Sequence, residues 1–388
     1  MSKYFLKLIA LLCVLLQYSP GLFSKENFQN SHKIPADVSY LAVDLKYHPE
    51  RGVQICEIQH GVPSMLGGDA FTHGGDSVIA QNVVKELSKF YNHSWISIQS
   101  FPDPSLRRNF SAAEKWIDVK GFKDLVHDKL FLECAAMPVI DPTDLASYHG
   151  FVFMNPKATD DRERFKKKYP GVLLIDNAVY KLRRDKFKMT ELLMGNELTE
   201  KHKPKWGRYN LDKETGLAEK IINEIGSDLL VIKPLDAWKG RGIIILKKED
   251  LSETLEYLFK RKPLDTPGID SEHTYWLLNK SKHFIVEEFI EVEPSYLHIS
   301  DGKLYSPTMR LVFLLFYSRQ TIEVICLGGY TYYPQKSISD EGTLTEKYKT
   351  ACGPPYYSKC DPEIFASAAE QMKDVLYIVY KKLLELGD

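Results

Sequence analysis

Residues Leu229–Leu246 read L-L-V-I-K-P-L-D-A-W-K-G-R-G-I-I-I-L. Two apolar runs flank a polar segment that contains Gly240 and Gly242, which predicts an antiparallel hairpin with a glycine loop. Lys233 ends the first run, directly before Pro234. An ammonium at the end of a buried strand, facing the bare amides of a glycine loop, is well placed to hold a phosphate. The alternative is an ordinary surface hairpin whose lysine extends its charged head into water.

The composition around this hairpin is that of an ordinary globular protein. The chain has 388 residues, of which 44% are hydrophobic and 27% charged, and its formal net charge is -1 at pH 7. The length predicts two or three domains with sizeable cores. Because basic residues are not in excess, nucleic acid is not expected as a partner.

The N-terminal segment differs from the rest of the chain. Lys3 and Lys7 precede the apolar run Leu8–Leu16, and small or turn-forming residues follow up to Ser24. This order is typical of a secretory signal peptide and predicts export after cleavage near Ser24. The run is too short to span a bilayer, so the mature protein is expected to have no stable membrane span. The alternatives are a short buried helix or a start codon assigned too early, and the protein would then be cytoplasmic.

The sequence contains six cysteines, of which Cys13 lies in this leader. Their spacing predicts neither a disulfide framework nor a zinc site. Cys352 and Cys360 could bridge a local loop in an oxidising compartment, although nothing in the sequence requires it.

A second polar pattern lies near the start of the chain. Val38–Tyr47 and Val53–Gln59 predict two strands joined by a turn. Asp44 interrupts the first apolar run, and Glu57 and Gln59 share one face of the second strand. If the strands pair about the turn, these side chains converge and present the oxygen ligands that Mg²⁺ prefers. The alternative is the solvated face of an ordinary hairpin.

Residues 62–180 predict a small α/β layer. A glycine-rich loop precedes a helix expected at Val78–Tyr91. Short apolar runs then alternate with polar or helical stretches, which predicts the strands of a mostly parallel sheet. These runs are Trp95–Ser100, Leu130–Met137, Gly150–Asn155 and Gly171–Asp176, with a charged helix at Asp160–Tyr169.

The second half of the chain also alternates between helical and extended patterns. Helices are expected at Arg184–Gly195, Leu217–Ile225, Lys248–Lys260 and Pro362–Leu386. Strands are expected at Phe284–Glu293, Thr308–Phe316 and Glu323–Tyr333, and an irregular loop at Pro334–Cys360. Lys186 lies in the first turn of its helix, where the dipole opposes a cation, so another group is expected to require it there.

Taken in the order in which they occur along the chain, these motifs resemble those of the ATP-grasp superfamily. That superfamily includes glutathione synthetase and D-alanine–D-alanine ligase. The resemblance implies that Lys186, after Asp185, and Lys233 hold ATP phosphates beneath the loop Gly240–Gly242. It further implies that Arg310 stabilises the transferring phosphoryl group or acyl phosphate. The segment of Glu287, Glu288, Phe289 and Ile290 matches the hinge that binds adenine through its backbone, and Glu293, or less closely Glu291, matches the acid that binds ribose.

The metal-binding end of this family is an Asp followed by Glu-x-Asn, and it would be expected after the C-terminal helix. Here Asp44 and Glu57-Ile58-Gln59, near the N-terminus, match it. The chain therefore resembles a circularly permuted ATP-grasp protein in which Asp44, Glu57 and Gln59 bind Mg²⁺ or Mn²⁺, with Gln59 in place of the usual Asn.

The resemblance also implies a division of the chain. The expected fold is mixed α+β and α/β, with two α+β subdomains clasping ATP and a preceding α/β domain. The parts are a signal peptide (1–24), permuted metal-binding strands (25–61), an acceptor-binding α/β domain (62–180), and the N-terminal (181–285) and C-terminal (286–388) ATP-grasp subdomains.

The activity that the resemblance implies is an ATP- and Mg²⁺-dependent carboxylate–amine or carboxylate–thiol ligase. It would form an acyl phosphate, release ADP and phosphate, and act on small-molecule or peptide carboxylates and amines. One alternative is a kinase that phosphorylates a small-molecule hydroxyl. Another is a nucleotide-binding relative without catalysis, which Gln59 and the leader favour. An amide product rather than a phosphoester would distinguish a ligase from a kinase.

Overall fold

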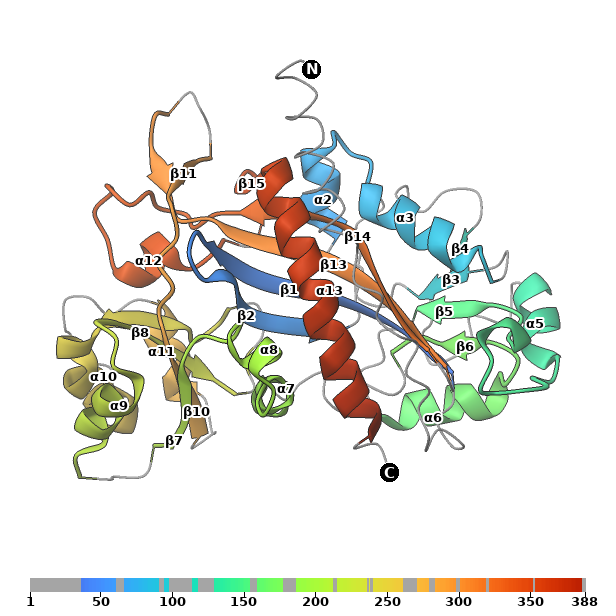
Figure 1. The fold of residues 1–388 in the computed structure, drawn as a ribbon, viewed down its shortest axis with the longest axis horizontal. Helices are drawn as coiled ribbons and strands as arrows, with labels where there is room; N and C mark the ends of the chain where they lie inside the picture. The colour runs from blue at the N-terminus through green and yellow to red at the C-terminus, as the bar shows by residue number, and fades with distance from the viewer. Residues whose placement is uncertain are drawn as a thin grey trace, which may run out of the picture.

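The computed structural model describes residues 36–60, 66–90, 94–97, 114–117, 129–153, 159–176, 186–211, 215–235, 237, 240–260, 271–278, 283–297, 301–318, 321–351 and 353–385. These parts form a mixed α/β molecule with two larger antiparallel sheets and one parallel sheet (Figure 1). This combination confirms the mixed α+β and α/β fold class expected from the sequence. The expected leader, Asp185, Cys352 and positions 236, 238 and 239 of the glycine loop lie outside the described residues.

The larger antiparallel sheet combines strands from both ends of the chain. Its order is β15-β14-β13-β1-β2. The strands are β1 (Asp37–His48), β2 (Gly52–His60), β13 (Thr308–Tyr317), β14 (Ile322–Tyr332) and β15 (Tyr357–Ser358). Asp44 of β1 lies opposite Arg310 of β13 on one side and Glu57 of β2 on the other. The hairpin expected at the start of the chain is therefore confirmed, and it completes the sheet formed by the C-terminal strands.

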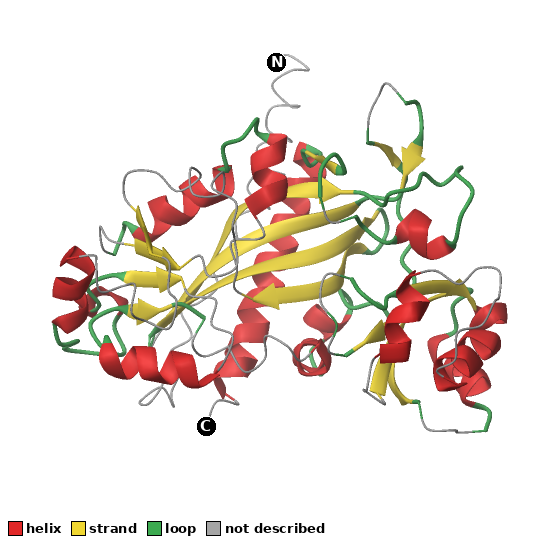
Figure 2. Cartoon of the chain, turned by 180° about the vertical axis from the view of Figure 1, so that it is seen from behind, coloured by secondary structure: helices red, strands yellow, loops and turns green. Residues whose placement is uncertain are grey.

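Alternation along β1 sends successive side chains to opposite faces of this sheet. Leu41, Val43 and Leu45 pack beneath the long helix α13 (Pro362–Glu385), which crosses one face (Figure 1). Tyr40 and Ala42 pack on the other face, seen in Figure 2, in a core that includes residues of α2 (Leu66–Thr72) and α3 (Val78–Leu87). Further along β1, this second face carries polar side chains instead.

A β-bulge decides which face the polar residues of β2 occupy. The pairing of β2 with β1 shifts between Asp44 and Leu45, so that Cys56 is an extra residue. As a result, Ile58 rather than Glu57 packs into the core beneath α13. Glu57 stays on the same face as Asp44.

The second antiparallel sheet has the order β7-β10-β8-β9. Its strands are β7 (Trp206–Asn210), β8 (Leu229–Pro234), β9 (Ile244–Lys247) and β10 (His283–Glu288). Strands β8 and β9 form the hairpin expected from the sequence. Leu230 and Ile232 pack into a core with residues of α9 (Leu217–Ile225), α10 (Leu251–Lys260) and α11 (Ser271–Leu278). The alternate residues Val231 and Lys233 therefore face away from these helices.

The third layer is the parallel sheet expected between residues 62 and 180, with the order β4-β3-β5-β6. Its strands are β3 (Ser94–Ser97), β4 (Glu114–Ile117), β5 (Phe151–Phe153) and β6 (Leu173–Leu174), beside α5 (Lys129–Ala136) and α6 (Thr159–Lys168). The strand expected at Leu130–Met137 is wrong, because α5 occupies this stretch. Its buried residues Phe131, Cys134 and Ala135 recur at helical spacing.

Several other expectations need correction. The loop expected before Val78 contains α2, and the loop expected at Pro334–Cys360 contains α12 (Leu344–Tyr348) and β15. The pattern did not predict β7, the short helix α8 (Glu197–Glu200) or the small hairpin of β11 (Ser295–Tyr296) and β12 (Leu304–Tyr305). The expected subdomain boundary at 285/286 falls inside β10, which pairs entirely with β7 and β8. Helix α7 (Lys186–Leu193) begins at the lysine singled out above.

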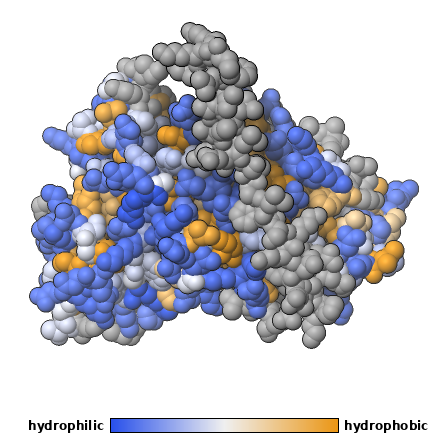
Figure 3. Space-filling view, in the orientation of Figure 1, coloured by the Kyte–Doolittle hydropathy of each residue, from blue (hydrophilic) through white to orange (hydrophobic). Residues whose placement is uncertain are grey.

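On the face of the molecule shown in Figure 3, hydrophilic side chains predominate and apolar residues form separate patches. Within the part of the chain that the structure describes, no helix is both long and apolar enough to cross a membrane.

Candidate functional site

A cavity of about 360 Å³ lies between the two antiparallel sheets. Its volume is within the range of small-molecule sites. The larger sheet contributes Asp44, Lys46, Glu57, Gln59, Arg310 and Tyr330, whereas the second sheet contributes Val231, Lys233, Ile245, Ile285 and Glu287. Lys186 of α7 and the hinge residues Phe289 and Ile290 complete this part of the lining. The structure thus brings together residues that lie near opposite ends of the chain.

Charged and amide groups meet on the larger sheet. Arg310 binds Asp44 through two contacts, Nε to Oδ1 and Nη2 to Oδ2, each of 2.7 Å. The Gln59 amide nitrogen donates to Asp44 Oδ2 at 3.1 Å and to Glu57 Oε2 at 2.8 Å. Lys186 Nζ lies 3.4 Å from Glu57 Oε1, which provides the partner expected for a lysine in the first turn of its helix.

This geometry fits a divalent cation. Two carboxylate oxygens that converge on one donor can converge on a cation instead, and a rotated Gln59 side-chain amide would present its oxygen to the same point. Among the described residues, no group of three His, Cys, Asp or Glu side chains could hold a metal ion. Asp44, Glu57 and Gln59 would therefore share a metal with oxygens of a ligand or of water.

The second sheet carries a different charged cluster. Glu287 accepts hydrogen bonds from Lys203 and Lys233, each at 2.6 Å. Burial alone would raise the pKa of Glu287, but the two ammonium groups outweigh it and hold the pKa below its usual range. Burial lowers the pKa of Lys203, and the neighbouring Lys233 ammonium also acts to lower it, whereas the Glu287 carboxylate acts in the opposite direction. Lys233 Nζ also donates to the Cys56 carbonyl at 3.1 Å, and this bond joins the two sheets.

Beside these charges, the cavity has an apolar part. Val231, Ile243, Ile245 and Ile285 line it together with Phe289 and Ile290. Such a surface suits a flat ring with polar edges. The amides of Glu288 and Phe289 donate to the carbonyls of Lys205 (2.8 Å) and Leu229 (3.0 Å). In the described part of the hinge, this leaves the Ile290 amide as the donor that could meet a ring nitrogen.

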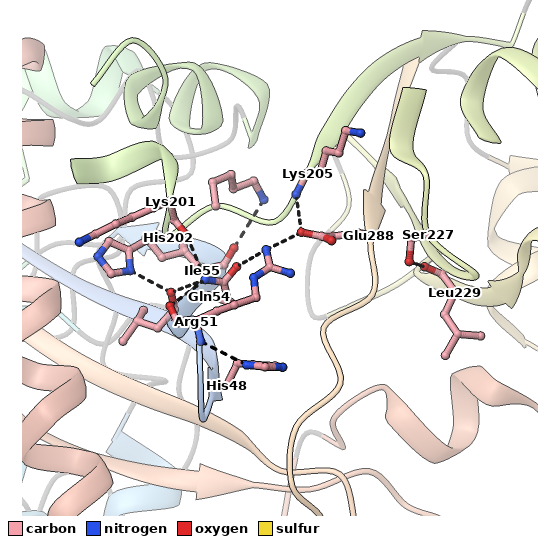
Figure 4. A network of polar contacts seen from close by, with 12 residues as sticks. His48, Arg51, Gln54, Ile55, Lys201, His202, Lys205, Ser227, Leu229 and Glu288 are labelled. Carbon is pink, nitrogen blue, oxygen red and sulfur yellow. Dashed lines mark hydrogen bonds and ion pairs between the residues drawn. The ribbon is translucent and has the colours of Figure 1, made fainter. Parts of the chain in front are cut away.

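A polar network fixes the hinge to the β1–β2 turn (Figure 4). Arg51 Nη2 lies 2.6 Å from Glu288 Oε1, which also accepts from the Lys205 amide at 2.9 Å. Next to it, Gln54 donates to the Lys201 carbonyl at 3.0 Å. The N-terminal hairpin is thus held directly against the strand that leads into the hinge.

Most of the expected site residues line the cavity, but two do not. Gly240 lines it and has a φ of +69°, which favours glycine. Gly242 also has a positive φ, of +72°, but lies outside the lining, and its amide donates to Glu272. Glu293 is exposed and outside the lining as well. The functional roles assigned to the expected residues stay predictions.

Two buried lysines that line the cavity, Lys46 and Lys203, are not among the site residues expected from the sequence. Lys46 follows Asp44 by two residues on the same strand face, and this spacing could have indicated it. Its Nζ donates to Ser306 Oγ at 2.9 Å and to the Pro307 carbonyl at 3.0 Å, and burial lowers its pKa to about 8. Lys203 lies in the polar stretch H-K-P-K before the unpredicted strand β7, where nothing signalled burial.

No protein-family model and no curated protein matches the sequence. Among solved structures, a protein assigned as a gamma-glutamylcysteine synthetase from Methylobacillus flagellatus KT is similar, with 9% identity, 91% of each chain covered and a TM-score of 0.42. A D-cycloserine synthetase shares 11% identity over 75% of this chain and 81% of its own, with a TM-score of 0.36. The D-alanine-D-alanine ligase from Coxiella burnetii shares 9% identity over 77% and 96%, with a TM-score of 0.29. Likeness at this level assigns no activity to this chain.

Proposed function

We propose that the protein is a circularly permuted ATP-grasp enzyme that joins a carboxylate to an amine or a thiol with ATP and Mg²⁺. One observation carries this proposal. The phosphate-binding pattern of Lys186 and Lys233 and the metal-binding pattern of Asp44 and Glu57, which are far apart in the sequence, line a single cavity. A solvated surface hairpin would not place Asp44 against Arg310.

The proposed roles follow from position and charge. ATP would bind with its base in the apolar part of the cavity and its phosphates toward Lys233 and Lys186. Mg²⁺ on Asp44, Glu57 and Gln59 would fit the donor set, and when bound it supplies positive charge that neutralises the phosphates. The Asp44 carboxylate holds the Arg310 guanidinium in place beside this point, ready to stabilise negative charge on a transferring group.

The reaction would need no nucleophilic side chain. An oxygen of the substrate carboxylate attacks the γ-phosphorus, the bond to the bridging oxygen of ADP breaks, and an acyl phosphate forms. The amine or thiol then attacks the acyl carbon, phosphate leaves, and the nucleophile loses its proton. The residues of the cavity would orient these groups and hold charge during both steps.

Two contacts between the ends of the chain support the proposed permutation. Strand β1 pairs with β13, and Tyr47 of β1 contacts Ser367 of α13 with 3.0 Å between their hydroxyl oxygens. The N-terminal hairpin would thus supply the metal-binding strands that are expected after this helix. We also propose that residues 62–180 bind the acceptor and that residues 1–24 direct export.

Hydroxylamine trapping tests the reaction type. The purified protein is incubated with ATP, Mg²⁺, hydroxylamine and pools of small carboxylates. The proposal predicts formation of ADP together with a hydroxamate, because hydroxylamine intercepts an acyl phosphate. A phosphoester without hydroxamate would instead identify a kinase. Nucleotide binding without ADP formation in any pool would contradict an enzymatic role.

A further inference from the structure

Lys46 is buried in the cavity in a neutral setting. The residue is 6% exposed and lies on β1. Its two described hydrogen bonds go to a hydroxyl, Ser306 Oγ, and to the carbonyl of Pro307. An ammonium has three N–H donors, and Lys46 contributes to the lining of the cavity. A ligand in the cavity can therefore reach this side chain.

The other cations of the cavity have carboxylate partners. Lys186 pairs with Glu57, Lys203 and Lys233 with Glu287, Arg310 with Asp44, and Lys349 with Glu272. Within the described part of the chain, no carboxylate lies at ion-pair distance from Lys46. Burying an ammonium without an anion is costly, so its retention in this position indicates a ligand with negative charge.

We propose that Lys46 binds the α-phosphate of the nucleotide, and this inference rests on the function proposed above. The Lys46 ammonium lies 5.8 Å from the centre of the Phe289 ring, in the hinge assigned to the base. Asp44, assigned to the metal, lies two residues away on the same strand face, which corresponds to about 7 Å along a strand. A group between the base and the metal-bound terminal phosphates is the phosphate attached to the ribose.

Nucleotides of increasing length test this assignment. Binding of adenosine, AMP, ADP and ATP to the full chain is measured by calorimetry without Mg²⁺, for the wild type and for Lys46→Met, which keeps the length and removes the charge. Lys46→Arg keeps the charge. Lys373→Met removes an exposed lysine of α13, which pairs with Glu370 outside the cavity, and serves as the matched control. Circular dichroism and thermal melting check that each variant is folded.

The inference predicts that Lys46→Met weakens the binding of AMP, ADP and ATP by the same factor, roughly 10- to 100-fold. Adenosine binding should not change, Lys46→Arg should retain most of the affinity, and Lys373→Met should match the wild type. Because the variant no longer buries a charge, its melting temperature without nucleotide should not fall.

Other outcomes would overturn the inference in recognisable ways. An equal loss for adenosine would mean that Lys46 acts by packing on Phe289. A loss confined to ATP would place the contact at a distal phosphate. Unchanged nucleotide binding with a raised KM for the carboxylate would assign Lys46 to the second substrate. If the wild type binds none of the four compounds, the proposed function fails as well, which distinguishes that result from a failure of Lys46 alone.

Discussion

The two sheets that face the cavity balance their charges differently. On the larger sheet, Asp44 and Arg310 form a one-to-one pair with two contacts. On the second sheet, Glu287 is shared by Lys203 and Lys233. The cluster of Lys203, Lys233 and Glu287 therefore carries one more positive than negative group, whereas the Asp44–Arg310 pair is neutral.

This difference indicates a division of labour between the walls. Excess positive charge in a partly dry site attracts phosphate and costs stability when no anion is bound. A matched pair is stable by itself and presents fixed groups to a cation or to a developing charge. In the proposed function, the metal would bind on the larger sheet and Lys233 would hold phosphate on the second sheet, so the nucleotide–metal complex would need both sheets.

Removing the shared carboxylate should have the largest effect. Glu287→Gln leaves the buried Lys203 ammonium and the partly buried Lys233 ammonium without their anion, and we expect a loss of about 3–5 kcal/mol in the free energy of unfolding. Saturating ATP should restore part of the lost free energy of unfolding, because its phosphates replace the missing negative charge. The neighbouring Glu288→Gln is the matched control, since Glu288 pairs with the half-exposed Arg51, and it should cost less than about 1 kcal/mol. Urea unfolding measures the free energy of unfolding of both variants. Equal losses in the two would refute the special role of the shared carboxylate.

Removing one lysine of this wall should have an intermediate effect. Lys233→Met should weaken ATP binding by about 2 kcal/mol or more, because a charge-assisted phosphate contact is lost. Lys248→Met removes an exposed lysine just after the same hairpin, paired with Asp228, and should leave affinity unchanged. Titration calorimetry on folded variants measures both. Wild-type ATP affinity in Lys233→Met would argue against the proposed membership of the ATP-grasp family.

A variant of the proposed metal site on the larger sheet should show the smallest effect on ATP binding. Its effect should depend on whether Mg²⁺ is present. Glu57→Gln removes a carboxylate of the proposed metal site, so the gain in ATP affinity on adding Mg²⁺ should fall by about 1–2 kcal/mol. With a chelator present in place of Mg²⁺, the ATP affinity of Glu57→Gln should stay close to that of the wild type. A variant that responds to Mg²⁺ as strongly as the wild type would remove Glu57 from the metal site.

Residues that break a local pattern could be predicted from the sequence. Asp44 and Arg310 interrupt apolar strands, and Lys233 precedes a proline at a strand end. Their meeting in one cavity could be expected only through the resemblance, because pairing of β1 with β13 is a long-range property.

The residues that were missed depend on tertiary context. Lys203 becomes buried only because Glu287 and β10 lie against it. The short strand β7 contains Gly207 and Arg208, which weaken a strand pattern. The stretch at 130–137 is a short apolar run, for which periodicity separates helix from strand poorly. The bulge at Cys56, which fixes the face of Glu57, follows from strand pairing and not from alternation.

A crystal structure with a non-hydrolysable ATP analogue and Mg²⁺ tests the central claim most directly. The claim is that both walls hold one nucleotide–metal complex. We predict Mg²⁺ at about 2.0–2.1 Å from oxygens of Asp44 and Glu57, with phosphate oxygens bonded to Lys186 and Lys233 and the base against Phe289 and Ile290. A nucleotide bound elsewhere, or a metal that contacts neither carboxylate, would contradict the account.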